Sequence, residues 1–491
     1  MKLETLLQEL NCKLIGAPNI AITSLCYDSR KAEPGSLYAC LPGTKTDGHQ
    51  FILQAQRQGA IAILCQSDWL QSHPPQNGSD LTWIGVDDTR AALAEIAAAF
   101  YAYPSRRLAL VGVTGTNGKT TTSHLIRSLL EKADRPTGLL GTLGCFFKDQ
   151  EIPTGFTTPF APELQQILAQ MQRAGAKAVA MECSSHALEQ HRLDALEFEC
   201  ALFTNLTQDH LDYHGDMQTY AAAKQILFEK LLKPTGTALL NADDPQSESY
   251  AGISRGKVIR YGLSPQADLR ASDPDYGLAG VSYTLHWQGQ THRVELALPG
   301  HYNILNSLAA LGAGLVLGLD LETQIHTLKS LPGVPGRLEV VTKTDHPFTV
   351  LVDYAHTPDS LQNVLATARQ FTPSRLLCVF GCGGDRDKSK RPQMGAIASE
   401  LADFSWVTSD NPRSEAPEAI LADILAGIAL RSKVEHEVDR QKAIEKALAT
   451  ARPGDVVIIA GKGHESYQIF QDRTIHFDDR EVARHWLERN P

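Results

Sequence analysis

Apolar runs and polar turns alternate along most of the chain, and their spacing predicts an α/β protein. Within residues 104–335 the apolar stretches LALVGVT, AVAME, CALFTNL and TALLNADD have the length and composition of buried strands. Leu164, Ile167, Leu168 and Met171 lie between two of these strands at the i, i+3, i+4, i+7 spacing of one helical face. Because strands that alternate with helices indicate a parallel sheet, we expect a parallel α/β domain over 104–335.

Two further segments flank this domain. After the Gly/Pro-rich turn LPGVPGRLE, the strand candidates are FTVLVDY, RLLCVFG, FSWVTSD and VVIIAGK, which predicts a third alternating domain over 336–491. The first hundred residues end in the alanine-rich helical pattern RAALAEIAAAFYAYP, and Pro104 to Arg107 follow as a linker, so we expect a first domain over 1–103. The stretch SDPDYGLAGVSYTLHWQGQTHRVELALPG is strand-rich and is expected as an insertion within the middle domain.

Composition narrows the class of protein. A chain of 491 residues is too long for one core and agrees with three domains, and its 43% hydrophobic and 21% charged residues are typical of a globular protein. The net charge of −10 disfavours nucleic acid and anionic membranes as partners. The N-terminus lacks a signal-peptide pattern, and no run approaches the ~18 apolar residues of a membrane span. With nine cysteines, an odd count without paired CxxC units, we expect reduced thiols and a cytoplasmic location.

A glycine-rich segment between a predicted strand and a predicted helix carries the strongest chemical signal. Its sequence, Gly112 to Thr121, is GVTGTNGKTT. In such a loop the glycines let backbone N–H groups converge on phosphate oxygens, and the helix N-terminus adds positive potential. Lys119 could then pair with the β- and γ-phosphates, and Thr120 could bind magnesium. The ordinary spacing GxxxxGK[ST] would need glycine at Val113, so only GKT matches it; the flanking strand and helix nevertheless favour a nucleotide site over a chance turn.

The variant loop GTNGKTT is similar to that of the Mur ligase family, which includes the folylpolyglutamate synthetases. MECSSHAL, TNLTQDHLDYHGDMQTYAAAK and NILNSLAA resemble further parts of that family's middle domain. The resemblance implies three α/β domains: an N-terminal UDP-binding domain, a central P-loop ATPase-like parallel-sheet domain and a C-terminal Rossmann-like domain. It also implies an amide ligase that uses ATP as co-substrate together with two Mg²⁺ ions.

The resemblance assigns nucleotide and metal roles within the middle domain. Glu182 ends a strand, where ligands of open α/β sheets bind, and its carboxylate suits Mg²⁺. From the residues alone His210 and Lys224 would be surface groups; the resemblance implies a metal ligand and a carbamylated lysine (N6-carboxylysine). The implied catalytic residues are Lys119, Lys224, Glu182 and His210, and the implied metal ligands are Thr120, Glu182, His210 and Lys224. The implied ATP-binding residues are Gly115, Thr116, Asn117, Gly118, Lys119, Thr120, Thr121, Asn303, Arg337, Asp353 and His356. Asn303 and the nearby Asn306 could equally cap a helix.

A UDP-sugar peptide is the second expected substrate. Residues 27–51, YDSRKAEPGSLYACLPGTKTDGHQF, resemble the uridine-binding domain of the tripeptide-forming members of the family, although Asp-Gly and Pro-Gly are also ordinary turn formers. Arg192 could hold a carboxylate of the muramoyl peptide with its planar fork, or could be a surface arginine. The implied residues for this substrate are Ser29, Asp47, His49, Thr157, Thr158, Ser184, Gln190 and Arg192.

Asp410-Asn411-Pro412-Arg413 follows the predicted strand FSWVTS and gives the specificity signal. It resembles the DNPR motif of family members that select meso-diaminopimelate over L-lysine, and its alternative interpretation is a proline-containing loop stop. Diaminopimelate carries an additional carboxylate, which Arg413 and Asn411 could pair with, whereas lysine would leave them unpaired. The implied diaminopimelate-binding residues are Arg386, Asp410, Asn411, Pro412, Arg413, Gly461 and Glu465.

The resemblance therefore implies a monomeric enzyme that adds meso-2,6-diaminopimelate to the D-glutamate γ-carboxylate of UDP-N-acetylmuramoyl-L-Ala-D-Glu through an acyl phosphate. A hinge near Gly333 to Arg337 is expected, because the amino-acid site must approach the nucleotide site. Three alternatives remain open: an L-lysine-adding muramoyl ligase, a folylpolyglutamate synthetase, and an ATP-dependent switch protein that performs no ligation.

Overall fold

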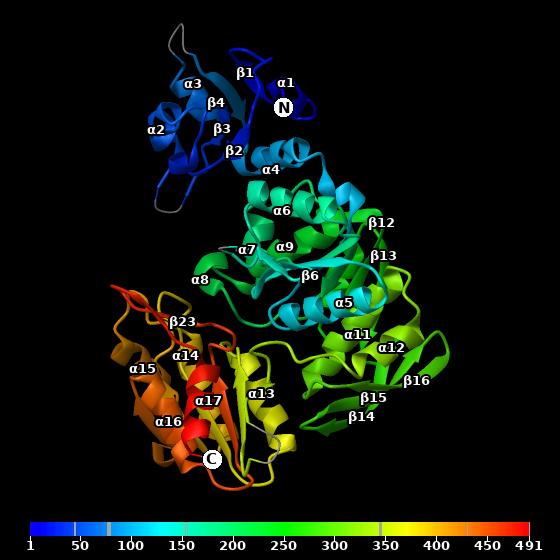
Figure 1. The fold of residues 1–491 in the computed structure, drawn as a ribbon, viewed down its shortest axis with the longest axis vertical. Helices are drawn as coiled ribbons and strands as arrows, with labels where there is room; N and C mark the ends of the chain where they lie inside the picture. Colours follow the sequence, from blue (N-terminus) through cyan, green and yellow to red (C-terminus); the bar gives the residue numbers. More distant parts are fainter. Residues whose placement is uncertain are drawn as a thin grey trace.

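Three large β-sheets of the described residues, each with its own helices, follow one another along the long axis of the molecule (Figure 1). The computed structural model describes residues 1–43, 46–75, 80–152, 154, 156–342, 346–429 and 431–490. Thr44 and Lys45 of the segment 27–51 lie outside the described residues. The predicted three-part α/β architecture is confirmed.

The N-terminal part contains a five-stranded sheet in the order β1 (Lys13–Ile15), β5 (Thr82–Val86), β4 (Ala60–Gln66), β3 (Ser36–Ala39) and β2 (Ser24–Cys26). All neighbours pair in parallel except β1 with β5. Its helices are α1 (Leu3–Leu6), α2 (Ile52–Arg57), α3 (Ser67–Ser72) and α4 (Thr89–Phe100). Asp88 caps α4, the predicted alanine-rich helix, by accepting hydrogen bonds from two backbone N–H groups of its first turn.

The middle part is built on an eleven-stranded sheet whose centre is parallel and whose ends are antiparallel. The order is β16 (Gln290–Leu296), β15 (Gly280–Trp287), β14 (Leu269–Gly277), β13 (Lys257–Gly262), β12 (Leu232–Asn241), β11 (Phe198–Phe203), β6 (Ala109–Thr114), β10 (Ala178–Glu182), β7 (Thr137–Gly141), β8 (Gly144–Phe147) and β9 (Gln150–Ile152). The predicted strand-rich insertion forms the antiparallel extension β14–β16.

Helices cover both faces of this central sheet. They are α5 (Lys119–Lys132), α6 (Ala161–Arg173), α7 (Ser185–Glu189), α8 (Leu211–His214), α9 (Met217–Ile226), α10 (Gln246–Ile253), α11 (His301–Val316) and α12 (Leu321–Leu328). The four periodic residues Leu164, Ile167, Leu168 and Met171 are all buried on α6, as their spacing predicts. Two hydrophobic cores result, one that includes α5 and α11 and one that includes α6.

The C-terminal part has a six-stranded sheet, parallel except at β17. The order is β17 (Glu339–Val340), β18 (Thr349–Asp353), β22 (Val456–Ala460), β19 (Leu376–Phe380), β20 (Phe404–Thr408) and β21 (Val434–Glu437). Its helices are α13 (Pro358–Gln370), α14 (Lys390–Leu401), α15 (Pro417–Ala426), α16 (Arg440–Thr450) and α17 (Asp479–Arg489), and a hairpin is formed by β23 (Tyr467–Ile469) and β24 (Thr474–His476).

Parallel sheets bind ligands beyond the carboxyl ends of their strands, and the predicted chemical residues occupy those positions. The phosphate loop follows β6, and Glu182 is the last residue of β10. In the C-terminal sheet, Asp353 ends β18 and the DNPR segment begins shortly after β20. Over the described ranges, none of the helices combines the length and the apolar character that crossing a bilayer requires.

Candidate active site

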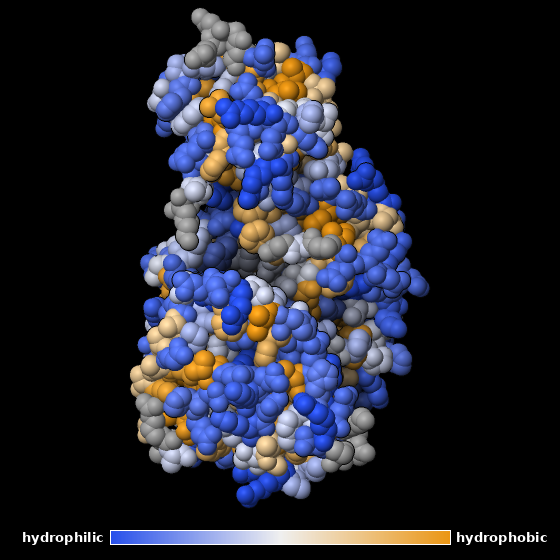
Figure 2. Space-filling view, turned by 60° about the vertical axis from the view of Figure 1, so that its left-hand side comes forward, coloured by the Kyte–Doolittle hydropathy of each residue, from blue (hydrophilic) through white to orange (hydrophobic). Residues whose placement is uncertain are grey.

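A cavity of about 470 Å³ lies between the middle part and the C-terminal part. Its wall combines the phosphate loop and the ends of β10 and β11 with residues that follow β18 and β19. Figure 2 shows the molecular surface recessed between the upper and lower halves of the molecule. The site is therefore shared between two parts that each contribute polar side chains.

Residues that follow β11 hold the phosphate loop in shape. Asn205 accepts a hydrogen bond from the Asn117 backbone N–H (2.9 Å) and donates one to its carbonyl (3.1 Å). Thr204 donates to the same carbonyl at 2.6 Å. Gly115 and Gly118 have φ angles of +144° and +87°, and a Cβ at Gly118 would come within 2.6 Å of Asn306 Oδ1. These contacts explain why the loop needs glycine at 115 and 118 and depends on a distant Thr-Asn pair.

Two lysines, Lys224 buried and Lys119 partly buried, share one carbonyl oxygen beneath the loop. Lys119 Nζ donates to Gly115 O (2.9 Å) and Thr116 O (2.8 Å), and Lys224 Nζ donates to Gly115 O (2.9 Å). Burial lowers the pKa of Lys119, and burial together with the Lys119 charge lowers the pKa of Lys224 well below its usual range. The pair thus favours either an anion close by or a neutral Lys224 amine, which is the form that reacts with CO₂.

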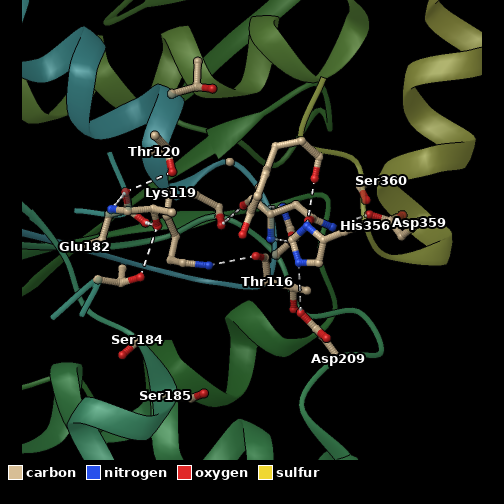
Figure 3. Close-up of a pocket in the computed structure, with 18 of the residues that line it drawn as sticks. Thr116, Lys119, Thr120, Glu182, Ser184, Ser185, Asp209, His356, Asp359 and Ser360 are labelled. Atoms are coloured by element: carbon tan, nitrogen blue, oxygen red, sulfur yellow. Dashed lines mark hydrogen bonds and ion pairs between the residues drawn. The ribbon is translucent and has the colours of Figure 1, made fainter. Parts of the chain in front are cut away.

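Glu182 accepts three hydrogen bonds at the edge of the loop. Its Oε1 accepts from the Thr120 hydroxyl and the Thr142 backbone N–H, both at 2.9 Å, and its Oε2 accepts from the Thr142 hydroxyl at 3.0 Å. Arg337 from the C-terminal part donates to Thr120 at 3.0 Å. Figure 3 shows Thr120, Lys119 and Glu182 grouped on one side of the pocket.

The oxygen atoms of Thr120 and Glu182 decide whether Mg²⁺ fits the site. In the part of the chain that the structure describes, no group of three or more His, Cys, Asp or Glu side chains is arranged to hold a metal. The adjacent Thr120 hydroxyl and Glu182 carboxylate are, however, hard oxygen donors of the kind Mg²⁺ takes together with phosphate oxygens and water. Lys224 would become an oxygen donor only as a carbamate. The donor set therefore fits magnesium when a nucleotide and the modified lysine complete it.

A histidine and carboxylate group spans the two parts on the other side of the pocket. Asp209 Oδ2 lies 3.4 Å from His210 Nε2 and 3.9 Å from His356 Nε2, and Figure 3 shows Asp209 below His356. Burial lowers the pKa of His210 below its usual value and that of His356 to about 4. For Asp209, burial acts to raise the pKa, but His210, Lys390 and His356 outweigh it and hold the pKa below its usual value.

The side of the cavity nearest the N-terminal part is aromatic and cationic. The Arg192 guanidinium lies 3.9 Å from the Phe160 ring centroid and donates to the Thr158 carbonyl at 2.9 Å. Gln190 Oε1 accepts from Arg192 at 2.6 Å. Tyr27 of the N-terminal part donates to Glu163 at 2.9 Å beside this cluster. Arg192 is buried and oriented by these contacts, which does not match a surface arginine.

The DNPR segment is closely packed within the C-terminal part. Asn411 Nδ2 donates to Glu465 Oε2 at 2.8 Å, and Arg413 Nη1 donates to the Gly384 carbonyl at 2.8 Å. Gly383 lies between the side chains of Arg413 and Arg386. A Cβ at this position would lie 2.9 Å from Arg413 Nη1 and 3.9 Å from Arg386 Cγ, so a larger residue would crowd Arg413. Gly461 (φ +119°) packs against Asp410, because its Cβ would lie 2.7 Å from Asp410 Oδ2.

The cavity brings together many, but not all, of the residues identified from the sequence. It is lined by Thr116, Asn117, Gly118, Lys119, Thr120, Thr121, Thr157, Thr158, Glu182, Ser184, Arg192, His210, Lys224, Arg337, Asp353, His356 and Arg386. Its lining does not include Gly115, Asn303, Gln190, Ser29, Asp47, His49, Asp410, Asn411, Pro412, Arg413, Gly461 or Glu465. Asp47 acts as a turn cap for the His49 N–H. Asn303 is within α11 and donates to the Pro299 carbonyl (2.7 Å), which is not a cap of that helix.

Several lining residues were missed by the sequence analysis. Thr142, Asp209, Tyr220, Tyr302 and Asp359 all face the cavity. Asp359 accepts from Asn117 Nδ2 at 2.8 Å and so joins α13 to the phosphate loop. Asp209 precedes His210 in TNLTQDH and could have been found there, whereas Thr142 and Tyr302 stand in segments without a chemical pattern of their own.

Three family models match successive segments of the chain. They are described as Mur ligase family, catalytic domain (residues 21–101), Mur ligase middle domain (residues 113–314) and Mur ligase, glutamate ligase domain (residues 336–463). Together they span most of the chain and all three sheets.

Curated relatives and solved structures match over nearly the full length. The UDP-N-acetylmuramoyl-L-alanyl-D-glutamate–2,6-diaminopimelate ligase of Thermosynechococcus vestitus is 50% identical, over 96% of this chain and 94% of its own. The ligase of the same name from Gloeobacter violaceus is 47% identical, over 100% and 98%. A solved structure with that name has a TM-score of 0.70 at 34% identity and covers 100% of this chain and 99% of its own. The MurF ligase from Thermotoga maritima in complex with ADP shares the fold, with a TM-score of 0.67 at 20% identity over 95% and 98%.

Proposed function

The chain belongs to the Mur ligase family, and we propose that it is the ATP-dependent ligase that adds meso-2,6-diaminopimelate to UDP-N-acetylmuramoyl-L-alanyl-D-glutamate in peptidoglycan synthesis. Relatives that carry this activity in their names are 50% and 47% identical over almost the whole chain. The observation that carries the proposal is the shared cavity, where the phosphate loop of the middle part faces Arg386 of the C-terminal part.

The first step is attack of the D-glutamate γ-carboxylate on the γ-phosphorus of ATP, which forms an acyl phosphate and releases ADP. Two anions must approach one another, so the site has to neutralise charge. Lys119 and the backbone N–H groups of the loop are positioned at the N-terminus of α5 for that task. The residues proposed to bind ATP are those named from the sequence, with Asn303 on the adenine side and with Asp353 and His356 facing the nucleotide from the C-terminal part.

Two Mg²⁺ ions fit this proposal: Thr120 and Glu182 would hold one, and His210 with Lys224 as N6-carboxylysine would hold the other. When bound, the ions supply positive charge that lowers the repulsion between the carboxylate and the phosphates. The lowered pKa of Lys224 supports the modification, because a neutral amine is needed to capture CO₂. Its 1% exposure also means that an unmodified ammonium would be costly to bury.

In the second step the diaminopimelate amine attacks the acyl carbon and phosphate leaves. We assign the amino acid to Arg386, Asp410, Asn411, Pro412, Arg413, Gly461 and Glu465. Arg413 and Asn411 supply donors for a carboxylate, and Glu465 supplies an acceptor for an ammonium group. Because Asn411 and Glu465 lie outside the cavity lining, movement about the segment Gly333–Arg337 is needed to bring the amine to the acyl phosphate.

The UDP-sugar peptide is assigned to the N-terminal part and the adjoining wall of the cavity. Ser29, Asp47 and His49 would take the uridine diphosphate, and Thr157, Thr158, Ser184, Gln190 and Arg192 would take the muramoyl dipeptide. The buried, stacked guanidinium of Arg192 supports a role in holding a carboxylate. We propose a cytoplasmic monomer, and the nine free thiols agree with a reducing compartment.

The decisive experiment incubates the purified protein with ATP, Mg²⁺ and the UDP-muramoyl dipeptide, and compares meso-diaminopimelate, L-lysine and glutamate as acceptors. The expected result is ADP and UDP-linked tripeptide with diaminopimelate, and little product with the others. Preferred use of lysine would favour the lysine-adding alternative, and elongation of a folate with glutamate would favour the folylpolyglutamate synthetases. Amino-acid-independent ATP hydrolysis without product would favour the switch protein.

A further inference from the structure

A fully buried lysine that the assigned site does not use contacts two of the assigned diaminopimelate-binding residues. The Lys462 side chain has 0% exposure, and its Nζ lies 2.8 Å from Glu465 Oε2 and 3.3 Å from Asn411 Oδ1. Asn411 Nδ2 donates to the same Glu465 oxygen at 2.8 Å. The three side chains therefore form a closed triangle that joins the segment after β20 to the segment after β22.

This triangle fixes the orientation of the Asn411 amide. Oδ1 accepts from both the Ile469 backbone N–H (3.0 Å) and Lys462 Nζ. The opposite orientation would place the amide NH₂ against two donors, so the assignment is determined by its partners. An amide nitrogen has two N–H groups, and one of them is used on Glu465. Asn411 can offer a ligand a donor, which suits a carboxylate.

The same triangle fixes one oxygen of Glu465 and does not engage the other. Oε2 is engaged by Lys462 and Asn411, whereas Oε1 lies 3.5 Å from the hydroxyl of Tyr354, which is long for an O–H···O bond. Tyr354 lines the cavity, and Glu465 keeps 12% of its side chain exposed. Glu465 can therefore offer a ligand an acceptor, which suits an ammonium group.

We propose that Lys462 is a positioning residue that sets the donor and acceptor polarity of the diaminopimelate site. It orients Asn411 toward a carboxylate and Glu465 toward an ammonium, the two groups that the distal stereocentre of diaminopimelate presents. This inference rests on the proposed function. A purely structural role for Lys462, as a counter-ion in a buried region, would instead affect folding and all substrates alike.

The analogue 2-aminopimelate separates these possibilities, because it keeps the distal carboxylate of diaminopimelate and lacks its distal ammonium. The wild-type protein is first assayed with diaminopimelate; absence of ligation would overturn the proposed function and the inference with it. In Lys462→Met, the KM for diaminopimelate is expected to rise about 10–100-fold, as for loss of one charged hydrogen bond. The KM values for ATP and the UDP-dipeptide are expected to stay within about twofold, because their assigned residues do not contact this triangle.

The preference for diaminopimelate over 2-aminopimelate is the sharper measurement. It is expected to fall about tenfold or more in Lys462→Met, because the ammonium acceptor Glu465 is no longer held in place. An unchanged preference in an active variant overturns the inference and leaves the proposed function standing. Lys442→Met, at a lysine with a 66% exposed side chain in the same part, is the matched control and is expected to behave as wild type.

Lys462→Met leaves a buried carboxylate uncompensated and can unfold. In that case Lys462→Met combined with Glu465→Gln is compared with Glu465→Gln alone. Lys462 Nζ lies closer to Glu465 Oε2 (2.8 Å) than to Asn411 Oδ1 (3.3 Å), and Asn411 Oδ1 also accepts from Ile469 N–H, so the two KM values for diaminopimelate are expected to agree within about threefold. A further rise of tenfold or more in the combined variant overturns the inference.

Discussion

The phosphate-loop site and the amino-acid site differ in the partners of their cationic side chains. Among the described residues, neither Lys119 nor Lys224 lies within 4.0 Å of a carboxylate, and both donate to the neutral Gly115 carbonyl. In the C-terminal part, Lys462 pairs with Glu465 at 2.8 Å and Arg440 pairs with Asp479 at 2.7 Å, all with little or no exposure. In the first site no carboxylate pairs directly with either lysine, although Glu182 and Asp209 act on them from a distance, whereas in the second each cation pairs with a carboxylate.

This difference separates the expected roles of the two sites. Cations without carboxylate partners are stabilised when an anion arrives, and most strongly when negative charge moves between phosphate and carboxylate in the transition state. A compensated, hydrogen-bonded site changes little on binding and selects by complementarity. Substitutions in the loop are therefore expected to lower kcat, and substitutions around the DNPR segment to raise KM for one substrate.

Lys119→Ala would test the comparison most severely. Removal of the loop cation is expected to lower acyl phosphate formation by about 10³-fold or more, the range seen for groups that stabilise phosphoryl transfer. The measurement is ADP release and trapping of the acyl phosphate with hydroxylamine. Lys132→Ala, at the exposed end of the same helix, is the control and is expected to remain active. Unchanged turnover of Lys119→Ala would contradict the proposed role of this loop in binding ATP.

Lys224→Ala is expected to have the next largest effect. If the lysine is carbamylated it contributes a carboxylate rather than a cation, and its loss is expected to lower kcat about 10²–10³-fold. Activity of the wild type is expected to fall when dissolved CO₂ is removed and to return with bicarbonate. Lys230→Ala, at an exposed lysine nearby, is expected to keep the wild-type kcat and the same dependence on CO₂. Intact-protein mass that shows an unmodified amine in a fully active enzyme would contradict the modification.

Arg413→Ala tests the other side of the comparison. Loss of the guanidinium is expected to raise KM for diaminopimelate about 10²-fold through one lost charge-assisted contact, with KM for ATP nearly unchanged. Steady-state kinetics with each substrate varied in turn provide the measurement. Arg473→Ala, at an arginine whose side chain is 65% exposed, is the control. Equal increases for ATP and diaminopimelate would show that the C-terminal site is not a separate selective site.

The sequence predicted the two sites unequally, and the reason is physical. A phosphate loop is one contiguous segment between a strand and a helix, so its position could be inferred from GTNGKTT alone. The compensated charges of the C-terminal part come from distant segments, such as Arg440 on α16 and Asp479 on α17, and no local pattern announces them. Lys462 stands within GKGHES, yet only the folded chain shows that it contacts Asn411, 51 residues away.

Cross-domain contacts were not predictable for the same reason. Asp359 lies in the first turn of α13, within an ordinary capping sequence, and its bond to Asn117 spans 242 residues. Tyr27 and Glu163 likewise join the N-terminal part to α6 of the middle part across 136 residues. Strand and helix positions follow from periodicity within a short window, but the way in which two finished domains meet depends on surface side chains whose partners are not local.

The contacts between the two sites provide the mildest test. Gln208, in the segment after β11, donates from Nε2 to Ser389 Oγ at 2.9 Å and to Asp387 at 3.2 Å, which links the middle part to the start of α14. If the two sites must approach each other during each turnover, Gln208→Ala is expected to change kcat by about two- to fivefold, because the lost bonds are partly exposed.

The direction of this effect distinguishes a closed from an open resting arrangement. If these bonds stabilise the arrangement in which the amine reaches the acyl phosphate, kcat falls; if they must break before product leaves, kcat rises. Single-turnover measurements separate the chemical step from release. Gln393→Ala is the matched control, because this exposed glutamine of α14 bonds to Ser389 O within its own helix region. The same small change in kcat for both variants would mean that the Gln208 contact does not couple the amino-acid site to the phosphate-loop site.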